Sequence, residues 1–129
     1  MNSPAKDTTP ALPSPRAAAG REAEAMAERF LRQRGLRLLA RNYRVKGGEI
    51  DLVCRDGHST VFVEVRLRRG QAFGGAAASI TPSKRARLIL AARHWLVEHG
   101  NGACRFDCVL LPDLDESRLE WLQDAFSAD

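Results

Sequence analysis

Apolar residues recur at three- and four-residue steps in two stretches of the chain, which is the spacing that buries one face of a helix. The first stretch predicts a helix over residues 17–34, ended by Gly35. The second predicts a helix over residues 82–99, with Thr81 as its N-terminal cap. Residues 1–16 are rich in Pro, Ser, Thr and Ala and show no periodicity, so we expect a disordered tail there.

Outside these helices the pattern becomes an alternation of apolar and polar residues, which is typical of strands. The clearest strand runs over residues 60–68, with Val61, Val63 and Val65 on one face and Phe62 on the other. The remaining predicted strands cover residues 36–45, 50–55 and 103–111, and residues 119–126 fit either an edge strand or a short helix. The order predicts one α/β domain over residues 17–129.

Two neighbouring strands carry charged residues at alternating positions. Glu49 and Asp51 share one strand face, and so do Glu64 and Arg66 on the next strand. Asp56 and Gly57 predict a turn between the two strands. A two-residue loop places Glu49 opposite Glu64, whereas a four-residue loop places Asp51 opposite Glu64. Either loop length puts all four charged side chains on one face of the hairpin.

Carboxylates that face each other across strands repel, so this face needs an explanation. One explanation is a divalent cation, because Mg²⁺ prefers carboxylate oxygens and retains several waters. Such an ion activates water and neutralises charge on a phosphate under attack, which suits phosphodiester hydrolysis. The other explanation is an exposed face whose acids pair with nearby arginines, and the spacing alone leaves both open.

Charge is distributed unevenly along the chain. Residues 16–93 carry 17 basic and 7 acidic side chains, whereas residues 94–129 carry 2 basic and 8 acidic ones. Of the 20 basic residues, 17 are arginines, whose planar guanidinium group suits phosphate. A basic segment of this kind favours a polyanionic partner such as nucleic acid. The alternative is that an arginine-rich composition simply supplies arginine at solvated positions.

Composition also excludes several classes of protein. No apolar run approaches the roughly 18 residues that a membrane helix needs, and residues 1–16 lack the apolar stretch of a signal peptide. Three cysteines, none of them in a C-x-x-C motif, do not form a disulfide framework. We therefore expect a cytoplasmic protein that does not contact a membrane.

The motif GGEIDLV, followed by VFVEVR, resembles the YraN-like family of small bacterial proteins. Further resemblance extends over residues 20–126, in the segments Gly20–Ala27, Arg41–Tyr43, Ser79–Lys84, Arg105–Asp107 and Ala125–Phe126. That family is placed by resemblance in the PD-(D/E)xK nuclease superfamily. The resemblance therefore implies the restriction-endonuclease-like fold, an α-β-β-β-α-β core with a central mixed sheet flanked by helices.

The resemblance also implies roles for individual residues. Asp51 looks like the first acid of the nuclease motif and Glu64 like the second, while Arg66 occupies the lysine position. Glu49 and Glu24 are candidate helper residues, and Glu49 is also a candidate metal ligand beside Asp51 and Glu64. The implied cofactor is Mg²⁺ or Mn²⁺. Arg66 stays protonated and cannot act as a base, although it can stabilise negative charge.

Lys84 is a candidate substitute for the missing lysine, provided that the fold brings it near the acids. The predicted nucleic-acid contacts are Arg66, Arg68, Arg69, Lys84, Arg85, Arg41 and Arg44. The leading hypothesis is a metal-dependent nuclease acting on DNA, with branched and single-stranded DNA among the candidate substrates. The alternatives are a nucleic-acid-binding module without turnover, and an adaptor whose acidic C-terminal segment contacts a protein partner.

Overall fold

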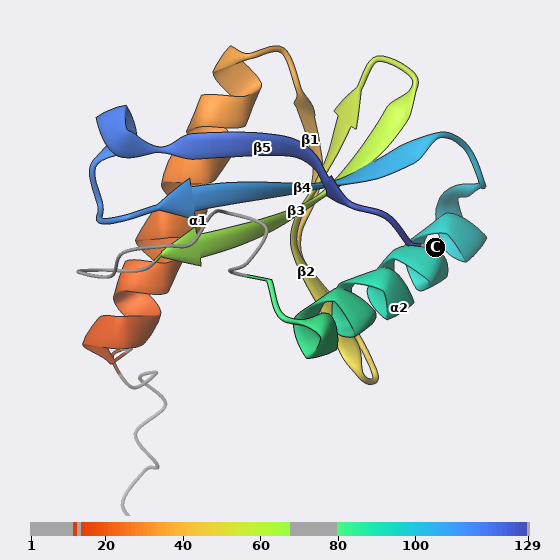
Figure 1. Cartoon of the computed structure of the whole chain (residues 1–129), viewed down its shortest axis with the longest axis horizontal. Coiled ribbons are helices and arrows are strands. Elements are labelled where there is room, and N and C mark those ends of the chain that lie inside the picture. The colour runs from red at the N-terminus through yellow and green to blue at the C-terminus, as the bar shows by residue number, and fades with distance from the viewer. Residues whose placement is uncertain (1–11, 13, 68–79, 129) are drawn as a thin grey trace, which may run out of the picture.

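The computed structural model describes residue 12 and residues 14–67 and 80–128. In these ranges it shows two long helices and a five-stranded sheet (Figure 1). The elements are α1 (Pro15–Gln33), β1 (Arg37–Val45), β2 (Gly48–Asp56), β3 (Ser59–Leu67), α2 (Pro82–His99), β4 (Cys104–Leu111), the short 3-10 helix η2 (Glu116–Arg118) and β5 (Glu120–Phe126).

The strands lie in the order β1-β2-β3-β4-β5, which is also their order along the chain. β3 and β4 run parallel, because α2 connects them, whereas every other neighbouring pair is antiparallel. This confirms the predicted α/β fold and its central mixed sheet, with the element order of a restriction-endonuclease-like core. The segment over residues 119–126 is a strand at the edge of the sheet and not a helix.

The two faces of the sheet are covered by different helices, as Figure 1 shows. Against α1 the sheet buries mainly aliphatic side chains, among them Leu52, Val61 and Val63. Against α2 it buries a more aromatic cluster that includes Phe62 and Phe106. On β3 this matches the predicted alternation, because odd positions face α1 and even positions face α2. Neither helix has an apolar stretch long enough to cross a membrane, in the part of the chain that the structure describes.

The first helix begins earlier than the sequence pattern predicts. Ser14 caps it, accepting a hydrogen bond from the backbone N–H of Ala17 at 3.1 Å, and Pro15 occupies its first turn. Pro15 and Arg16, which we assigned to the tail, therefore belong to α1. The rest of the predicted tail, apart from residues 12 and 14, lies outside the described residues, as do residues 68–79.

A buried acid ties the last two strands together. Asp107 on β4 is fully buried and accepts hydrogen bonds from Arg105 Nε at 3.0 Å and from Trp121 Nε1 at 2.9 Å. The backbone N–H of Asp124 donates to the same carboxylate at 2.9 Å, where the β4–β5 pairing shifts register. Arg105 and Asp107 are therefore a structural pair, and Asp107 is satisfied within the fold.

Candidate functional site

The register of the β2–β3 hairpin decides which acids meet. Asp56 pairs with Ser59, and Leu52 pairs with Val63. The turn therefore consists of Gly57 and His58, and one more step of the same register places Asp51 opposite Glu64. Of the two registers that the sequence left open, the structure adopts the one that brings these two acids together.

At the end of the β2–β3 pairing, the Asp51 carboxylate replaces a backbone hydrogen-bond acceptor of β2. Its Oδ2 accepts a hydrogen bond from the backbone N–H of Val65 at 2.8 Å. This bond holds Asp51 towards β3, beside the Glu64 side chain. Glu64 is only 2% exposed. The two carboxyl groups therefore lie side by side, on the sheet face that α2 covers.

Burial raises the pKa of Glu64 to about 8, with the negative charge of Asp51 and a hydrogen bond to it acting in the same direction. The nearby Lys84 partly opposes this shift. Near neutral pH the metal-free pair therefore holds a proton between its carboxyl groups, because two like charges at this distance do not both ionise readily.

Lys84 reaches the acids from the first turn of α2. The Thr81 hydroxyl caps this helix and accepts a hydrogen bond from the backbone N–H of Lys84 at 3.1 Å. The Lys84 Nζ lies 3.3 Å from Glu64 Oε2 and 3.8 Å from Glu49 Oε1. The structure thus brings this lysine to the acidic pair.

A glycine allows α2 to lie close to β2. A Cβ atom on Gly48 would stand 2.5 Å from the backbone oxygen of Arg87 and 3.1 Å from the backbone nitrogen of Ala91, both in α2. Any side chain at this position would therefore push the helix away. Gly48 is the second glycine of the GGEIDLV motif, so the motif sets the approach of the helix that carries Lys84.

Arg66 also lies at the acidic pair, on the same strand face as Glu64. Its Nη1 is 3.8 Å from Glu64 Oε2, and its side chain is 27% exposed. Its Nε is buried and has no hydrogen-bond partner among the described residues. Arg66 is thus more distant from the Glu64 carboxylate than Lys84, and it retains hydrogen-bonding capacity for another group.

Glu49 is paired with basic side chains. Its carboxylate is surrounded by cations, with Lys84 Nζ at 3.8 Å, Arg87 Nη2 at 3.5 Å and Arg44 Nε at 3.6 Å. Within the described ranges, no three His, Cys, Asp or Glu side chains form a group that could hold a metal ion. Of the three predicted metal ligands, the structure brings Asp51 and Glu64 together and places Glu49 among cations.

Glu24 on α1 approaches the pair from the other side of β2. Burial raises its pKa, followed by the charge of Asp51, while a hydrogen bond from the Asn42 side chain acts in the opposite direction. Asn42 has a φ of 49°, a left-handed conformation that asparagine tolerates better than most residues. The β1–β2 register places it opposite Asp51.

Asn42 is the residue of this region to which sequence reasoning gave no role. Its signal was an asparagine inside a predicted strand, where that residue type is uncommon.

The structure divides the predicted nucleic-acid contacts into several groups. Arg41 is bound to Glu28 of α1 by two hydrogen bonds, at 2.6 and 2.8 Å. Arg85 donates to the backbone oxygen of Ile80 at 3.2 Å, away from the acids. Arg66 and Lys84 lie at Glu64, and Arg44 lies beside Glu49. Two further arginines of the set, Arg68 and Arg69, lie outside the described residues.

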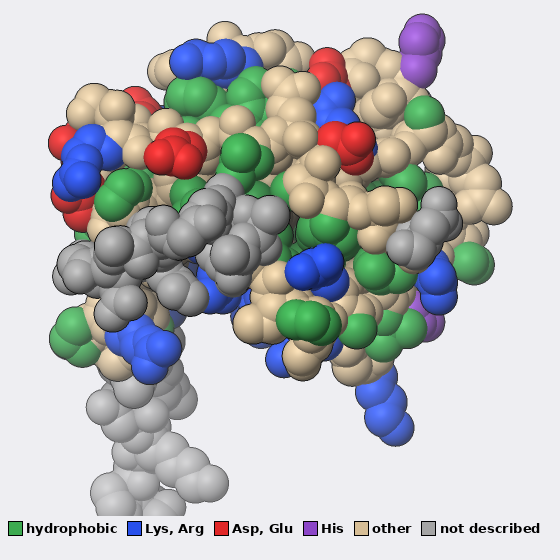
Figure 2. Space-filling view, viewed as in Figure 1, with side chains coloured by type: hydrophobic (Ala, Val, Ile, Leu, Met, Phe, Trp, Pro, Cys, Tyr) green, Lys and Arg blue, Asp and Glu red, His purple; other side chains and the backbone are tan. Residues whose placement is uncertain are grey.

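The surface charge is as uneven as the sequence suggests. On the face drawn in Figure 2, the acidic side chains in view lie in the upper half, over β5, over the segment before it and beside the β2–β3 hairpin. Over α2 and the turn between β1 and β2, the charged side chains in view are Lys and Arg. Part of the acidic charge is neutralised within the chain, because Arg118 pairs with Asp113 at 2.6 Å and Arg29 with Glu116 at 3.9 Å.

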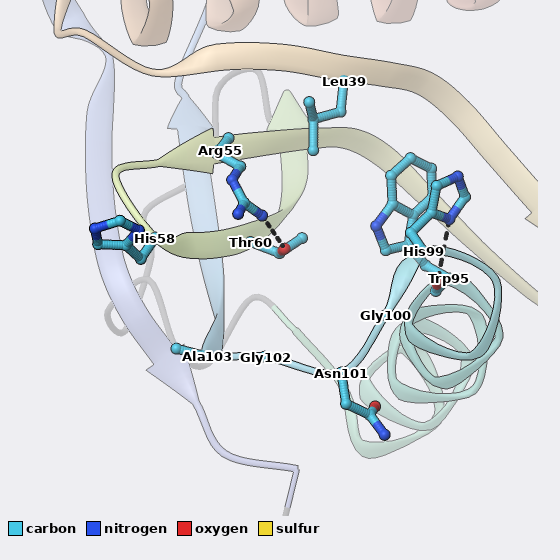
Figure 3. Close-up of a pocket in the computed structure, with 10 residues that line it drawn as sticks. All are labelled: Leu39, Arg55, His58, Thr60, Trp95, His99, Gly100, Asn101, Gly102 and Ala103. Carbon is cyan, nitrogen blue, oxygen red and sulfur yellow. Dashed lines mark hydrogen bonds between the residues drawn. The ribbon is translucent and has the colours of Figure 1, made fainter.

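A separate hollow of about 350 Å³ lies at the other end of the β2–β3 hairpin, next to the C-terminal end of α2 (Figure 3). The His99 ring stacks on Trp95 there, with ring centroids 3.7 Å apart. Arg55 points towards Thr60, to which it donates a hydrogen bond at 3.5 Å. The described residues that line this hollow include no carboxylate, so it does not share the chemistry of the Asp51–Glu64 pair.

Comparison with known proteins shows relatives along the whole chain. The model of "Uncharacterised protein family UPF0102" matches residues 23–111. A UPF0102 protein of Dechloromonas aromatica is 54% identical over 129 residues, covering 100% of this chain and 99% of the relative. UPF0102 proteins of Methylobacillus flagellatus and Cupriavidus taiwanensis are both 57% identical, over 109 and 116 residues. These alignments cover 84% and 88% of this chain and 96% and 86% of the relatives, respectively.

Proposed function

The chain belongs to the uncharacterised protein family UPF0102, the YraN-like family that its motifs resemble, and we propose that it is a divalent-metal-dependent nuclease that hydrolyses phosphodiester bonds of DNA in the cytoplasm. One observation carries this proposal. Asp51 and Glu64 lie side by side, with the Lys84 ammonium group 3.3 Å from the Glu64 carboxylate. Because the family description names no activity, the support comes from these residues.

The donor set of the pair suits a hard divalent cation. Glu64 is buried beside Asp51, and a shared proton limits their repulsion in the absence of a metal. Mg²⁺ commonly binds through one or two carboxylates and keeps several waters, so Asp51 and Glu64 are sufficient protein ligands. A bound Mg²⁺ or Mn²⁺ supplies an activated water and neutralises charge on the phosphate.

The protein's own residues hold the reacting groups around that position. The backbone N–H of Val65 fixes the orientation of Asp51, and Glu64 would have to lose its proton for the pair to hold a cation. In hydrolysis a water oxygen forms a bond to phosphorus and loses a proton, the bond from phosphorus to one sugar oxygen breaks, and the departing sugar oxygen gains a proton. Lys84 and Arg66 are placed to donate hydrogen bonds to the negative charge that develops on the phosphate.

Lys84 supports catalysis by this chain despite the arginine at the lysine position of the motif. An ammonium group on α2 occupies the neighbourhood of Glu64 that a lysine at position 66 would reach from β3. The proposal therefore assigns the lysine role to Lys84 and a phosphate-stabilising role to Arg66.

DNA is the substrate that the surrounding charges favour. The arginines beside the acids are exposed enough to meet a large ligand, because the Arg44 side chain is 72% and the Arg87 side chain 52% exposed. Both lie in the basic segment of residues 16–93. Guanidinium groups bind phosphate through paired hydrogen bonds, which suits a DNA backbone.

A cleavage assay tests the proposal directly. Labelled single-stranded, duplex and branched DNA is incubated with the protein and Mg²⁺ or Mn²⁺, with Asp51→Asn and Glu64→Gln as variants and Glu22→Gln, an exposed acid on α1, as the matched control. We expect cleavage to fall by about 10²-fold or more in the two site variants only, and to stop in EDTA. Equal cleavage by wild type and Asp51→Asn would assign the activity to a contaminant. Anomalous density in a Mn²⁺-soaked crystal checks the metal position independently.

A nucleic-acid-binding module without turnover is the second candidate. The observation that favours it is Arg66 itself, because an arginine cannot act as a base at that position. This candidate predicts salt-sensitive DNA binding that persists in EDTA, with no metal-dependent cleavage of any of the three substrates.

A further inference from the structure

Gly20 lies inside α1, at a position where the fold itself does not require glycine. A glycine in a helix interior costs about 1 kcal/mol relative to alanine. A Cβ atom built on Gly20 meets no atom of the described residues within 4 Å, and the φ of Gly20 is not positive. Packing and backbone conformation therefore give no reason for the missing side chain, in contrast to Gly48.

Two hollows in the surface share Gly20 as a lining residue. One, of about 750 Å³, lies between α1 and the end of β3, and Arg16 and Arg66 line it. The other, of about 560 Å³, lies between α1 and β1, and Arg21 and Arg44 line it. Two arginines thus line each hollow. Where the two hollows meet, at Gly20, α1 has no side chain.

Each hollow is lined by a residue that lies near one of the two acids. Arg66, which lines the first hollow, is 3.8 Å from Glu64. Asn42, which lines the second hollow, lies between Arg41 and Tyr43, whose partners across the β1–β2 pairing, Leu52 and Ile50, are the two neighbours of Asp51 in the chain. A chain of phosphates that spans the two hollows therefore crosses α1 at Gly20, with Arg66 of β3 on one side and Asn42 of β1 on the other.

We propose that one strand of nucleic acid crosses α1 at Gly20, with its phosphates contacted by Arg16 and Arg66 on one side and by Arg21 and Arg44 on the other. This inference rests on the proposed function for the identity of the polymer and adds that its bound form is single-stranded. The hollows have the volume of small-ligand pockets, about 300–1,000 Å³, which suits nucleotides of one strand and not a double helix. The absent side chain lets the sugar-phosphate backbone approach the helix.

The test is a binding experiment in EDTA, so that cleavage plays no part. Fluorescence anisotropy measures the affinity for a labelled oligothymidine and for a duplex of the same length. The variants are Gly20→Ala and Gly20→Leu, and the matched control is Ala18→Leu, which adds the same bulk at an exposed position of the same helix that lines neither hollow. Thermal unfolding checks every variant.

We expect Gly20→Leu to weaken oligothymidine binding by about tenfold or more, with Gly20→Ala intermediate and Ala18→Leu within about twofold of wild type. Gly20→Ala is expected to unfold at the same or a higher temperature than wild type, because alanine favours the helix. Arg44→Ala should reduce the salt dependence of log K by about 0.7, the value for one phosphate of a single strand.

Equal binding by Gly20→Leu and Ala18→Leu would overturn the strand path, as would equal losses for oligothymidine and duplex. The result is separable from the nuclease proposal. If Gly20→Leu loses single-strand binding while no metal-dependent cleavage is found, the strand path holds and the enzymatic function fails. If Asp51→Asn abolishes cleavage while Gly20→Leu binds and cleaves like Ala18→Leu, the enzymatic function holds and the path is wrong.

Discussion

The ammonium nitrogen of Lys84 lies 3.3 Å from Oε2 of Glu64, closer than the 3.8 Å that separates Arg66 Nη1 from the same oxygen. Lys84 belongs to α2 and Glu64 to β3, so the contact depends on the packing of the helix against the sheet. Lys84 is therefore the nearer of the two cations to this carboxylate, which supports the role that we propose for it.

Replacing Lys84 by methionine should lower the rate of metal-dependent cleavage by about 10²-fold, because the variant lacks a donor for the charge developing on the phosphate. The measurement is a single-turnover rate at saturating protein. Arg93→Met is the control, since Arg93 is an exposed cation farther along α2. Wild-type cleavage by Lys84→Met, combined with loss of cleavage in Arg66→Met, would transfer the role to Arg66.

The raised pKa of Glu64 predicts how stability depends on pH in EDTA. Burial and Asp51 raise this pKa from 4.5 to about 8, so the folded protein binds the proton more tightly than the unfolded chain. The stabilisation is fully present below pH 4.5 and is lost as the pH rises towards and through about 8. Each pKa unit corresponds to about 1.4 kcal/mol.

The Glu64→Gln variant has no carboxyl group at this position to titrate. The melting temperature of the variant minus that of the wild type should therefore increase as the pH is raised from 5 to 8. Thermal unfolding followed by circular dichroism gives the difference at each pH. Added Mn²⁺ should raise the melting temperature of the wild type at pH 8 but not that of Glu64→Gln. A pH-independent difference between the two proteins would show that Glu64 titrates normally.

The face shared by the acids was predictable from sequence, but their partners were not. Alternation along the strands places Asp51 and Glu64 on one face for any even loop length, which is why that prediction did not depend on the turn. The choice between Glu49 and Asp51 as the residue opposite Glu64 depends on the Gly57–His58 turn. Two loop lengths preserve the same alternation, so the sequence pattern could not separate them.

Contacts between segments that are distant in the chain could not be predicted from the sequence, for a different reason. Thr81 predicted where α2 begins and therefore that Lys84 lies in its first turn, but the reach of that lysine depends on how closely α2 approaches Gly48 of β2. The last strand was ambiguous because the register shift at Asp124, whose φ is 53°, interrupts the alternation that marks a strand.

Gly48 provides a test of that close approach. In Gly48→Ala the new methyl group meets the backbone of α2, so either the helix shifts or the variant loses stability. We expect a loss of about 1–3 kcal/mol in urea unfolding, the usual cost of overpacking, together with slower cleavage because Lys84 moves with the helix. The control is Gly102→Ala, since a Cβ atom at Gly102 meets nothing within 4 Å. Unchanged stability and cleavage in Gly48→Ala would show that α2 can yield without consequence.

Arg41 and Arg44 should differ in what they contribute, although both lie on β1. Arg41 makes a two-pronged contact with Glu28, whereas Arg44 is 72% exposed beside the acids. Arg44→Ala should therefore weaken DNA binding with little change in stability. Arg41→Ala should lower the melting temperature with a smaller effect on DNA affinity. Parallel anisotropy and thermal unfolding measurements compare them, and equal losses of affinity would mean that Arg41 leaves Glu28 when DNA binds.

Replacing Asp107 tests the stability of the fold independently of the Asp51–Glu64 pair. Replacing it by alanine removes the acceptor for Arg105, Trp121 and the Asp124 backbone, and leaves a partly buried guanidinium group with Asp56 as its remaining partner. We expect a loss of about 3–5 kcal/mol, the usual result of breaking a buried ion pair on one side.

Trp121→Phe removes a single donor to the same carboxylate and should cost about 1–2 kcal/mol. Urea unfolding measures both variants, and DNA binding by Trp121→Phe is measured under conditions where it is fully folded. Because Asp107 faces the α1 side of β4 while Glu64 faces α2, binding should be unchanged. A loss of affinity in folded Trp121→Phe would show that the β4–β5 edge takes part in recognition, and would extend the binding surface beyond the acids and α1.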